Sequence, residues 1–151
     1  MSILPKKYKM HYEVLTMGKI FSYPMTIKEV NLDLFGHVNN AEYLVLFEEA
    51  RWDLIHKNGY GLKKIWETNL GPTILEIKMR FLKELKARDE IVIESELLSY
   101  EKKVGKLRQD MKRGGEVCCS LELTIALFDM KERKLALPTP DWLKAVGGES
   151  V

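Results

Sequence analysis

The sequence predicts an α+β fold in which one amphipathic helix packs against an antiparallel sheet. Apolar residues recur at spacings of three and four over residues 40–57, as in a helix that lies on a flat surface. Residues 73–127 instead alternate apolar and polar side chains in several runs, which is typical of half-buried strands. A strand, one long helix and then a run of strands is an order that indicates α+β. The predicted apolar stripe of the helix consists of Tyr43, Leu46, Phe47, Ala50, Arg51, Leu54 and Ile55.

The first part of the chain supplies one strand and the helix. Residues 19–30 read as a strand that contains Pro24, and because proline has no N–H for the ladder, we expect either an edge strand or a strand that begins after Pro24. The helix ends at Asn58, and Gly59 can take the left-handed conformation that follows many helices. Residues 62–66 add a short helical turn.

The second part supplies the remaining strands. A hairpin turn is predicted at Gly114 and Gly115, and the sheet ends near residues 135–138. Pro140 suits the first turn of a short helix over residues 140–145. The predicted strands cover residues 73–81, 91–99, 104–112 and 117–127.

Composition bounds the class of protein. With 151 residues, 46% hydrophobic and 30% charged, the chain fits one soluble domain over residues 1–151, with a core over about 19–145. A net charge of +2 is too small to indicate nucleic-acid binding, and no apolar run is long enough to span a membrane. Pro5 and the lysines after it interrupt any signal peptide, so we expect a cytoplasmic protein.

Cysteine and histidine spacing gives no sign of a metal site. Cys118 and Cys119 are adjacent, which fits neither a disulfide framework nor a zinc motif. His11, His37 and His56 lie far apart along the chain. We therefore expect no metal and no cofactor.

The segment from Asp33 to Tyr43 concentrates the chemistry. It places an acid, a glycine, a histidine and two asparagines directly before the long helix. The first N–H groups of a helix have no partner within the helix and carry a partial positive charge. A carboxylate beside such donors can act on an acyl group, because the donors hold the carbonyl oxygen while the acid handles water or attacks carbon.

The string D-x-x-G-H-V-N-N-x-x-Y, followed by E-E-A-R, resembles the hotdog-fold acyl-CoA thioesterases of the 4-hydroxybenzoyl-CoA thioesterase-like family. The resemblance covers residues 19–145 and implies a sheet wrapped around one central helix. It implies hydrolysis of a fatty or aromatic acyl thioester, carried by coenzyme A or by an acyl carrier protein. It also implies a homodimer or homotetramer with sites between subunits. Many relatives carry a second acid at the position of Asn31.

The resemblance assigns roles residue by residue. Asp33 corresponds to the family's nucleophile or general base, and the sequence does not choose between these two routes. His37 either bonds the substrate carbonyl, orients Asp33 or braces the loop. The backbone N–H groups from Asn39 to Ala41 are candidate oxyanion donors, although Asn39 or Asn40 also fits a helix cap. Candidate catalytic residues are Asp33, His37 and Asn40, and candidate substrate-binding residues are Gly36, Asn39, Tyr43, Lys102 and Lys103.

Some alternatives remain open at this point. Glu49 would supply the acid if the chain followed the second branch of hotdog thioesterases, which places its carboxylate on the helix. Lys102 and Lys103 fit coenzyme A phosphates or a solvated hairpin. A non-catalytic acyl-CoA-binding module would bind without turnover, and a hotdog hydratase or dehydratase would need His37 to work with Asp33.

Overall fold

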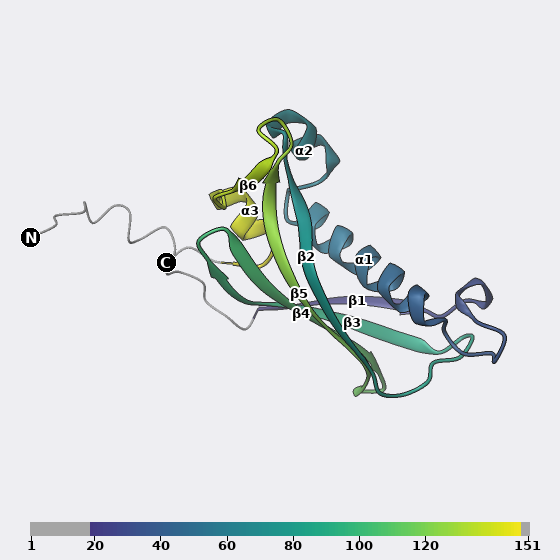
Figure 1. Cartoon of the computed structure of the whole chain (residues 1–151). Helices are drawn as coiled ribbons and strands as arrows, with labels where there is room; N and C mark the ends of the chain where they lie inside the picture. The colour runs from purple at the N-terminus through teal and green to yellow at the C-terminus, as the bar shows by residue number, and fades with distance from the viewer. Residues whose placement is uncertain (1–18, 149–151) are drawn as a thin grey trace, which may run out of the picture.

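The computed structural model of the protein describes residues 19–148 (Figure 1). The segment before residue 19, for which the sequence left an additional strand open, lies outside the described residues. The elements, in chain order, are β1 (Ile20–Thr26), the 3-10 turn η1 (Glu29–Asn31), α1 (Asn40–Lys57), α2 (Leu62–Thr68), β2 (Leu70–Phe81), β3 (Glu90–Glu101), β4 (Val104–Arg113), β5 (Glu116–Asp129), β6 (Lys134–Ala136) and α3 (Pro140–Ala145).

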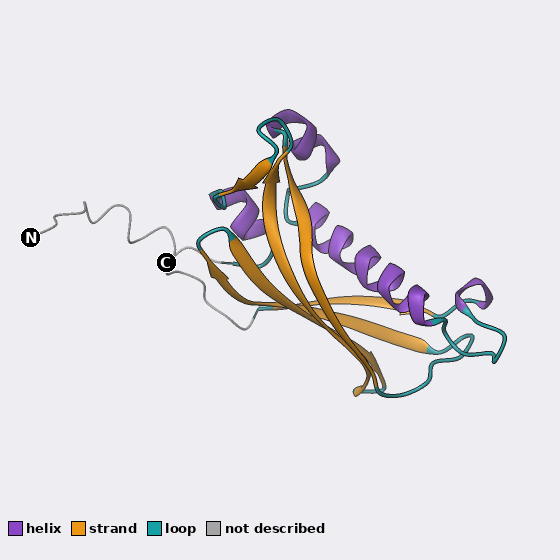
Figure 2. Ribbon diagram, in the orientation of Figure 1, coloured by secondary structure: helices purple, strands orange, loops and turns teal. Residues whose placement is uncertain are grey.

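One antiparallel sheet carries these strands in the order β1-β3-β4-β5-β2, and β6 pairs with the end of β5. The sheet curls around α1, so that the helix lies along its concave side (Figure 2). This arrangement is the predicted α+β architecture of a sheet wrapped around one long helix.

The long helix confirms the sequence prediction in both its bounds and its buried face. Its buried residues are those of the predicted apolar stripe, from Tyr43 to Ile55. Asn39 caps the first turn, and Gly59 follows the last turn with φ +90°. The apolar period of the sequence was sufficient because the helix meets the sheet along a single stripe.

The two edge strands differ from expectation. β1 lies at an edge, as Pro24 predicted, but it ends at Thr26 and the chain then turns through η1, so the extension to residue 30 is wrong. β2 forms the other edge and is not half-buried: Ile74, Leu75 and Ile77 are 38–49% exposed. A register shift between Ile74 and Glu76 also interrupts its alternation.

A buried polar network joins the middle of α1 to the sheet. Arg51 Nη1 donates to Gln109 Oε1 at 2.9 Å, and Gln109 Nε2 donates to Ser95 Oγ at 2.9 Å and to the carbonyl of Phe47 at 3.2 Å. Gln109 is fully buried and Arg51 nearly so. Burial lowers the pKa of the Arg51 guanidinium.

Candidate active site

The loop before α1 is built around the carboxylate of Asp33. Asp33 Oδ1 accepts hydrogen bonds from the backbone N–H of Phe35 at 2.8 Å and of His37 at 3.3 Å. The Gly36 N–H closes the same turn on the Asp33 carbonyl at 3.2 Å, with φ +80° at Gly36. That conformation favours glycine, so Gly36 shapes the turn, and its contact with substrate stays a prediction. Within residues 19–148, Oδ2 of Asp33 has no hydrogen-bond partner, so one oxygen remains free to react.

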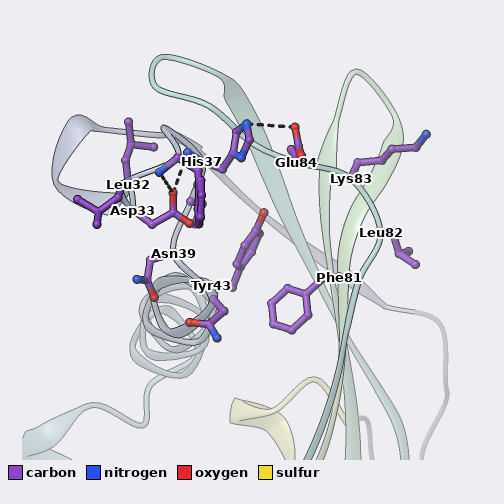
Figure 3. A pocket seen from close by; sticks show the side chains of 13 residues that line it. Leu32, Asp33, His37, Asn39, Tyr43, Phe81, Leu82, Lys83 and Glu84 are labelled. Atoms are coloured by element: carbon purple, nitrogen blue, oxygen red, sulfur yellow. Dashed lines mark hydrogen bonds and ion pairs between the residues drawn. The ribbon is translucent and has the colours of Figure 1, made fainter.

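Asp33 lines an open cleft of about 890 Å³. One wall is the loop with the first turn of α1, and the other is the segment from Phe81 to Glu84 that follows β2 (Figure 3). Leu34 and Phe35 rise from the tip of the turn and are 104% and 84% exposed. The cleft therefore joins one free carboxylate oxygen to apolar surface.

The three candidate oxyanion donors at the start of α1 differ in their partners. Asn39 Oδ1 accepts from the Ala41 N–H at 2.9 Å, which makes Asn39 the helix cap. The Asn39 N–H donates to the Asn31 carbonyl at 2.9 Å. Of the three candidate oxyanion donors, only the Asn40 N–H has no acceptor among the described residues.

Asn31 takes a structural part where many relatives carry an acid. Its side chain donates to Glu42 Oε2 at 3.1 Å and accepts from the Lys28 N–H at 2.8 Å. It thereby ties η1 to the first turn of α1.

Tyr43 lines the cleft between its two walls (Figure 3). Its ring is 5% exposed and meets the Phe81 ring edge to face, with centroids 5.3 Å apart. Burial raises the pKa of its hydroxyl. The ring lies between Asp33 and Phe81 (Figure 3).

The side chain of His37 turns to Glu84 and not to Asp33. His37 Nε2 lies 3.1 Å from Glu84 Oε2, while the His37 backbone N–H is the group that holds Asp33 (Figure 3). Sequence reasoning did not identify the wall from Phe81 to Glu84. The available signal was a charged pair, Lys83 and Glu84, directly after the end of a strand.

Glu49 lies outside this cleft. Its Oε1 accepts from the Tyr23 hydroxyl of β1 at 2.7 Å. This bond, with burial and the nearby charge, raises the pKa of Tyr23 to about 12.

Lys102 and Lys103 form the turn between β3 and β4, far from Asp33 in one subunit. Phe81, at the cleft, pairs with Cys119, whereas Val104 pairs with Ala126. The stretch of β5 between those two levels spans about 23 Å at ~3.3 Å per residue. One subunit therefore does not bring these lysines to the cleft.

Two features, a metal-binding cluster and a membrane-spanning helix, are absent from the described residues. No cluster of three His, Cys, Asp or Glu side chains is placed to hold a metal ion within residues 19–148. No helix in this range has the length and apolar character needed to cross a membrane.

Comparison with known proteins shows the family to which this chain belongs. The model of the Thioesterase-like superfamily matches residues 28–146, which include the loop, α1 and all strands except β1. The chain belongs to the Thioesterase-like superfamily. The family and the thioester-hydrolase class predicted from the sequence are confirmed.

Individual relatives agree with this membership. The chain is 29% identical over 110 residues to the long-chain acyl-CoA thioesterase FadM of Escherichia coli (strain K12). The aligned residues cover 72% of this chain and 83% of FadM. The crystal structure of "YbaW Probable Thioesterase" from Escherichia coli superposes with a TM-score of 0.75 at 24% identity, over 83% of this chain and 98% of YbaW. A hypothetical protein of Staphylococcus aureus in complex with CoA gives a TM-score of 0.80 at 16% identity, over 88% of each chain. The structural neighbours confirm the predicted α+β fold.

Proposed function

We propose that this chain hydrolyses acyl-CoA thioesters and that Asp33 performs the chemistry. The observation that carries the proposal is the state of its carboxylate: Oδ1 is held by two backbone N–H groups, while Oδ2 is free in the cleft. Because the loop fixes one oxygen, the other has a defined direction beside the N-terminus of α1.

The reaction divides between Asp33 and the start of α1. The unused Asn40 N–H, with the positive end of the helix, stabilises the negative charge on the thioester oxygen as a tetrahedral centre forms. Asp33 Oδ2 either removes a proton from water or attacks the carbonyl carbon to form an anhydride that water cleaves. Both routes consume one water and release an acid and a thiol.

Long-chain acyl-CoA is the first substrate class to test. The relative FadM carries that description, and the walls of the cleft here include Leu34, Phe35, Phe81 and Leu82. Coenzyme A enters as part of the substrate, and the proposal needs no separate cofactor. An acyl carrier protein thioester is the alternative carrier. A cytoplasmic location and a single domain over residues 1–151 stay predictions.

The active unit in this proposal is a homodimer that pairs sheet edges. Three observations support it: β2 ends the sheet order, exposes Ile74, Leu75 and Ile77, and runs directly into the cleft wall. An exposed apolar edge is otherwise a site of unwanted association. Lys102 and Lys103 would then reach the cleft of the partner subunit. Light scattering that finds only monomer at assay concentration would contradict this arrangement, and a mass of four subunits would indicate a dimer of dimers.

Thiol release from a panel of acyl-CoA and acyl carrier protein thioesters tests the function. The wild type, Asp33→Asn and Glu49→Gln are compared side by side. We expect turnover that collapses only in Asp33→Asn. Collapse only in Glu49→Gln would move the acid onto α1, and binding without any turnover would favour an acyl-CoA-binding module.

One further measurement separates the two routes. After a single turnover in isotopically labelled water, label on the Asp33 carboxylate indicates the anhydride route. Label only in the released acid fits either water activation or an anhydride that water cleaves at its acyl carbon, and trapping of acylated Asp33 with hydroxylamine in the same experiment separates these two.

A further inference from the structure

A second carboxylate faces the cleft from the wall opposite Asp33. Glu84 Oε2 lies 3.1 Å from His37 Nε2, with the Glu84 side chain 67% exposed and that of His37 30% exposed. Both residues line the cleft (Figure 3). A carboxylate accepts hydrogen bonds, so this contact places a hydrogen on Nε2 and leaves Nδ1 as the ring nitrogen available to a ligand.

The pair is not needed to hold the two walls together. The Val38 N–H already donates to the Leu85 carbonyl at 2.9 Å. Arg88 also binds both carboxylate oxygens of Glu29 at 2.9 Å, which joins η1, just before one wall, to the turn that follows the other wall. The His37–Glu84 contact therefore adds orientation of the imidazole and not attachment of the loops.

The position of the pair indicates which part of a thioester it meets. Asp33 and Asn39 lie on the α1 side of the cleft, whereas Glu84 and Lys83 lie on the other wall (Figure 3). Asn40 follows Asn39 as the first residue of α1. If the carbonyl oxygen of a thioester binds the helix donor, its sulfur can point toward that other wall. His37 stands between the two sides.

We propose that Glu84 is a positioning residue that holds His37 to protonate the departing sulfur. The inference rests on the proposed thioesterase function. As the C–S bond breaks, its electron pair goes to sulfur, and sulfur takes a proton from the protonated imidazole. Asp33 takes a proton from the attacking water and then releases it, and this proton restores the imidazole, so the reaction yields one carboxylic acid and one thiol.

Steady-state hydrolysis of an acyl-CoA tests the role of Glu84. The variants are Glu84→Ala, Glu84→Gln, His37→Gln and the double variant His37→Gln/Glu84→Ala. We expect Glu84→Ala to lower kcat about tenfold with KM unchanged, less than the ~100-fold or more expected for loss of a general acid itself. Glu84→Gln retains an acceptor oxygen and should recover part of the rate. In the His37→Gln background, loss of Glu84 should have no further effect.

Two controls separate positioning from structure. Glu29→Ala removes a similarly exposed carboxylate, 62% exposed, that joins the segments flanking the two walls through Arg88, and it should keep the wild-type kcat. An aryl thioester releases a more acidic thiol that needs no proton, so the loss in Glu84→Ala should shrink on that substrate.

Each other result overturns the inference. Equal losses in Glu84→Ala and Glu29→Ala would make the pair a structural tie. Additive losses in the double variant would show that Glu84 does not act through His37, and an undiminished loss on aryl thioesters would remove the leaving-group role. An active wild type with an unaffected Glu84→Ala overturns this inference alone, whereas a wild type that hydrolyses no acyl-CoA overturns the proposed function with it.

Discussion

The two ends of α1 have opposite character. At the C-terminal end, the rings of Tyr60 and Trp142 meet edge to face at 5.5 Å, and the Trp142 Nε1–H donates to the Tyr100 hydroxyl at 2.9 Å. Asn58 Nδ2 donates to the Ala145 carbonyl at 3.1 Å, which ties the helix end to α3. At the N-terminal end, Phe35 stands in solvent above an open cleft.

The two ends differ in whether their polar groups have hydrogen-bond partners within the chain. At the packed end, buried polar atoms and aromatic faces find partners within the chain. At the cleft end, Asp33 Oδ2 and the Asn40 N–H find none among the described residues. Substitutions at the packed end should therefore change stability, and substitutions at the cleft end should change turnover.

The sharpest test of this separation is Asp33→Asn. The amide retains the Oδ1 acceptor that builds the turn, but it cannot take a proton or attack carbon. We expect kcat/KM to fall by ~10²–10⁴-fold, while the free energy of unfolding changes by less than about 0.5 kcal/mol. Thiol release and urea unfolding measure the two effects. Comparable activity in the variant would remove Asp33 from the mechanism.

The reverse pattern is expected for Trp142→Ala. Trp142 is 1% exposed, and its loss leaves a cavity and an unpaired Tyr100 hydroxyl. Unfolding should become easier by about 3–5 kcal/mol, with unchanged kcat per folded molecule. Trp66→Ala is the matched control, because Trp66 is 70% exposed and its loss should cost no more than about 0.5 kcal/mol. A selective loss of kcat in Trp142→Ala would break the comparison.

Substitutions in the polar network at the middle of α1 should change stability, as substitutions at the packed end do. Gln109→Leu removes the acceptor that Arg51 uses, and it leaves a buried guanidinium without that bond. We expect a loss of about 1–3 kcal/mol in the free energy of unfolding. Adding Arg51→Met should restore part of it, since both polar partners are then gone. Chemical unfolding of the wild type and the two variants measures these changes, and a double variant less stable than Gln109→Leu would contradict this account.

The smallest effect concerns Tyr23→Phe, which breaks the bond to Glu49. The folded protein raises the pKa of Tyr23 from 10.0 to about 12, so the neutral phenol is the favoured form. Its contribution to stability is present below pH 10 and is lost as the pH rises toward 12. The late tyrosinate absorbance should decrease by the contribution of one tyrosine in Tyr23→Phe, because buried Tyr43 and Tyr100 also have raised pKa values, while kcat stays unchanged. Lower kcat would connect Glu49 to the reaction.

Local patterns predicted the parts of the molecule that local physics determines. The stripe on α1, its end at Gly59 and the first turn of α3 follow from period, backbone conformation and the position of Pro140. The Asp33 loop was found because its residues are contiguous. These features need only neighbours in sequence.

Long-range placement accounts for what the sequence did not predict. The exposure of β2 follows from strand order, which alternation does not encode. Glu84 meets His37 across the cleft from 47 positions away in the numbering, with no shared motif. Gln109 occupies the apolar face of β4 between Leu107 and Met111, and its partners on the facing helix and on β3 explain a polar residue there.

The turn around Asp33 also restricts what the sequence at this position can become. The same carboxylate that is free at one oxygen builds its own loop with the other, through contacts two and four residues along the chain. A glutamate carries the same charge, but its extra methylene would move the oxygens away from those N–H groups. Glutamate therefore cannot replace Asp33 without loss of these contacts. Transfer of this chemistry to another scaffold would require the whole turn and not the acid alone.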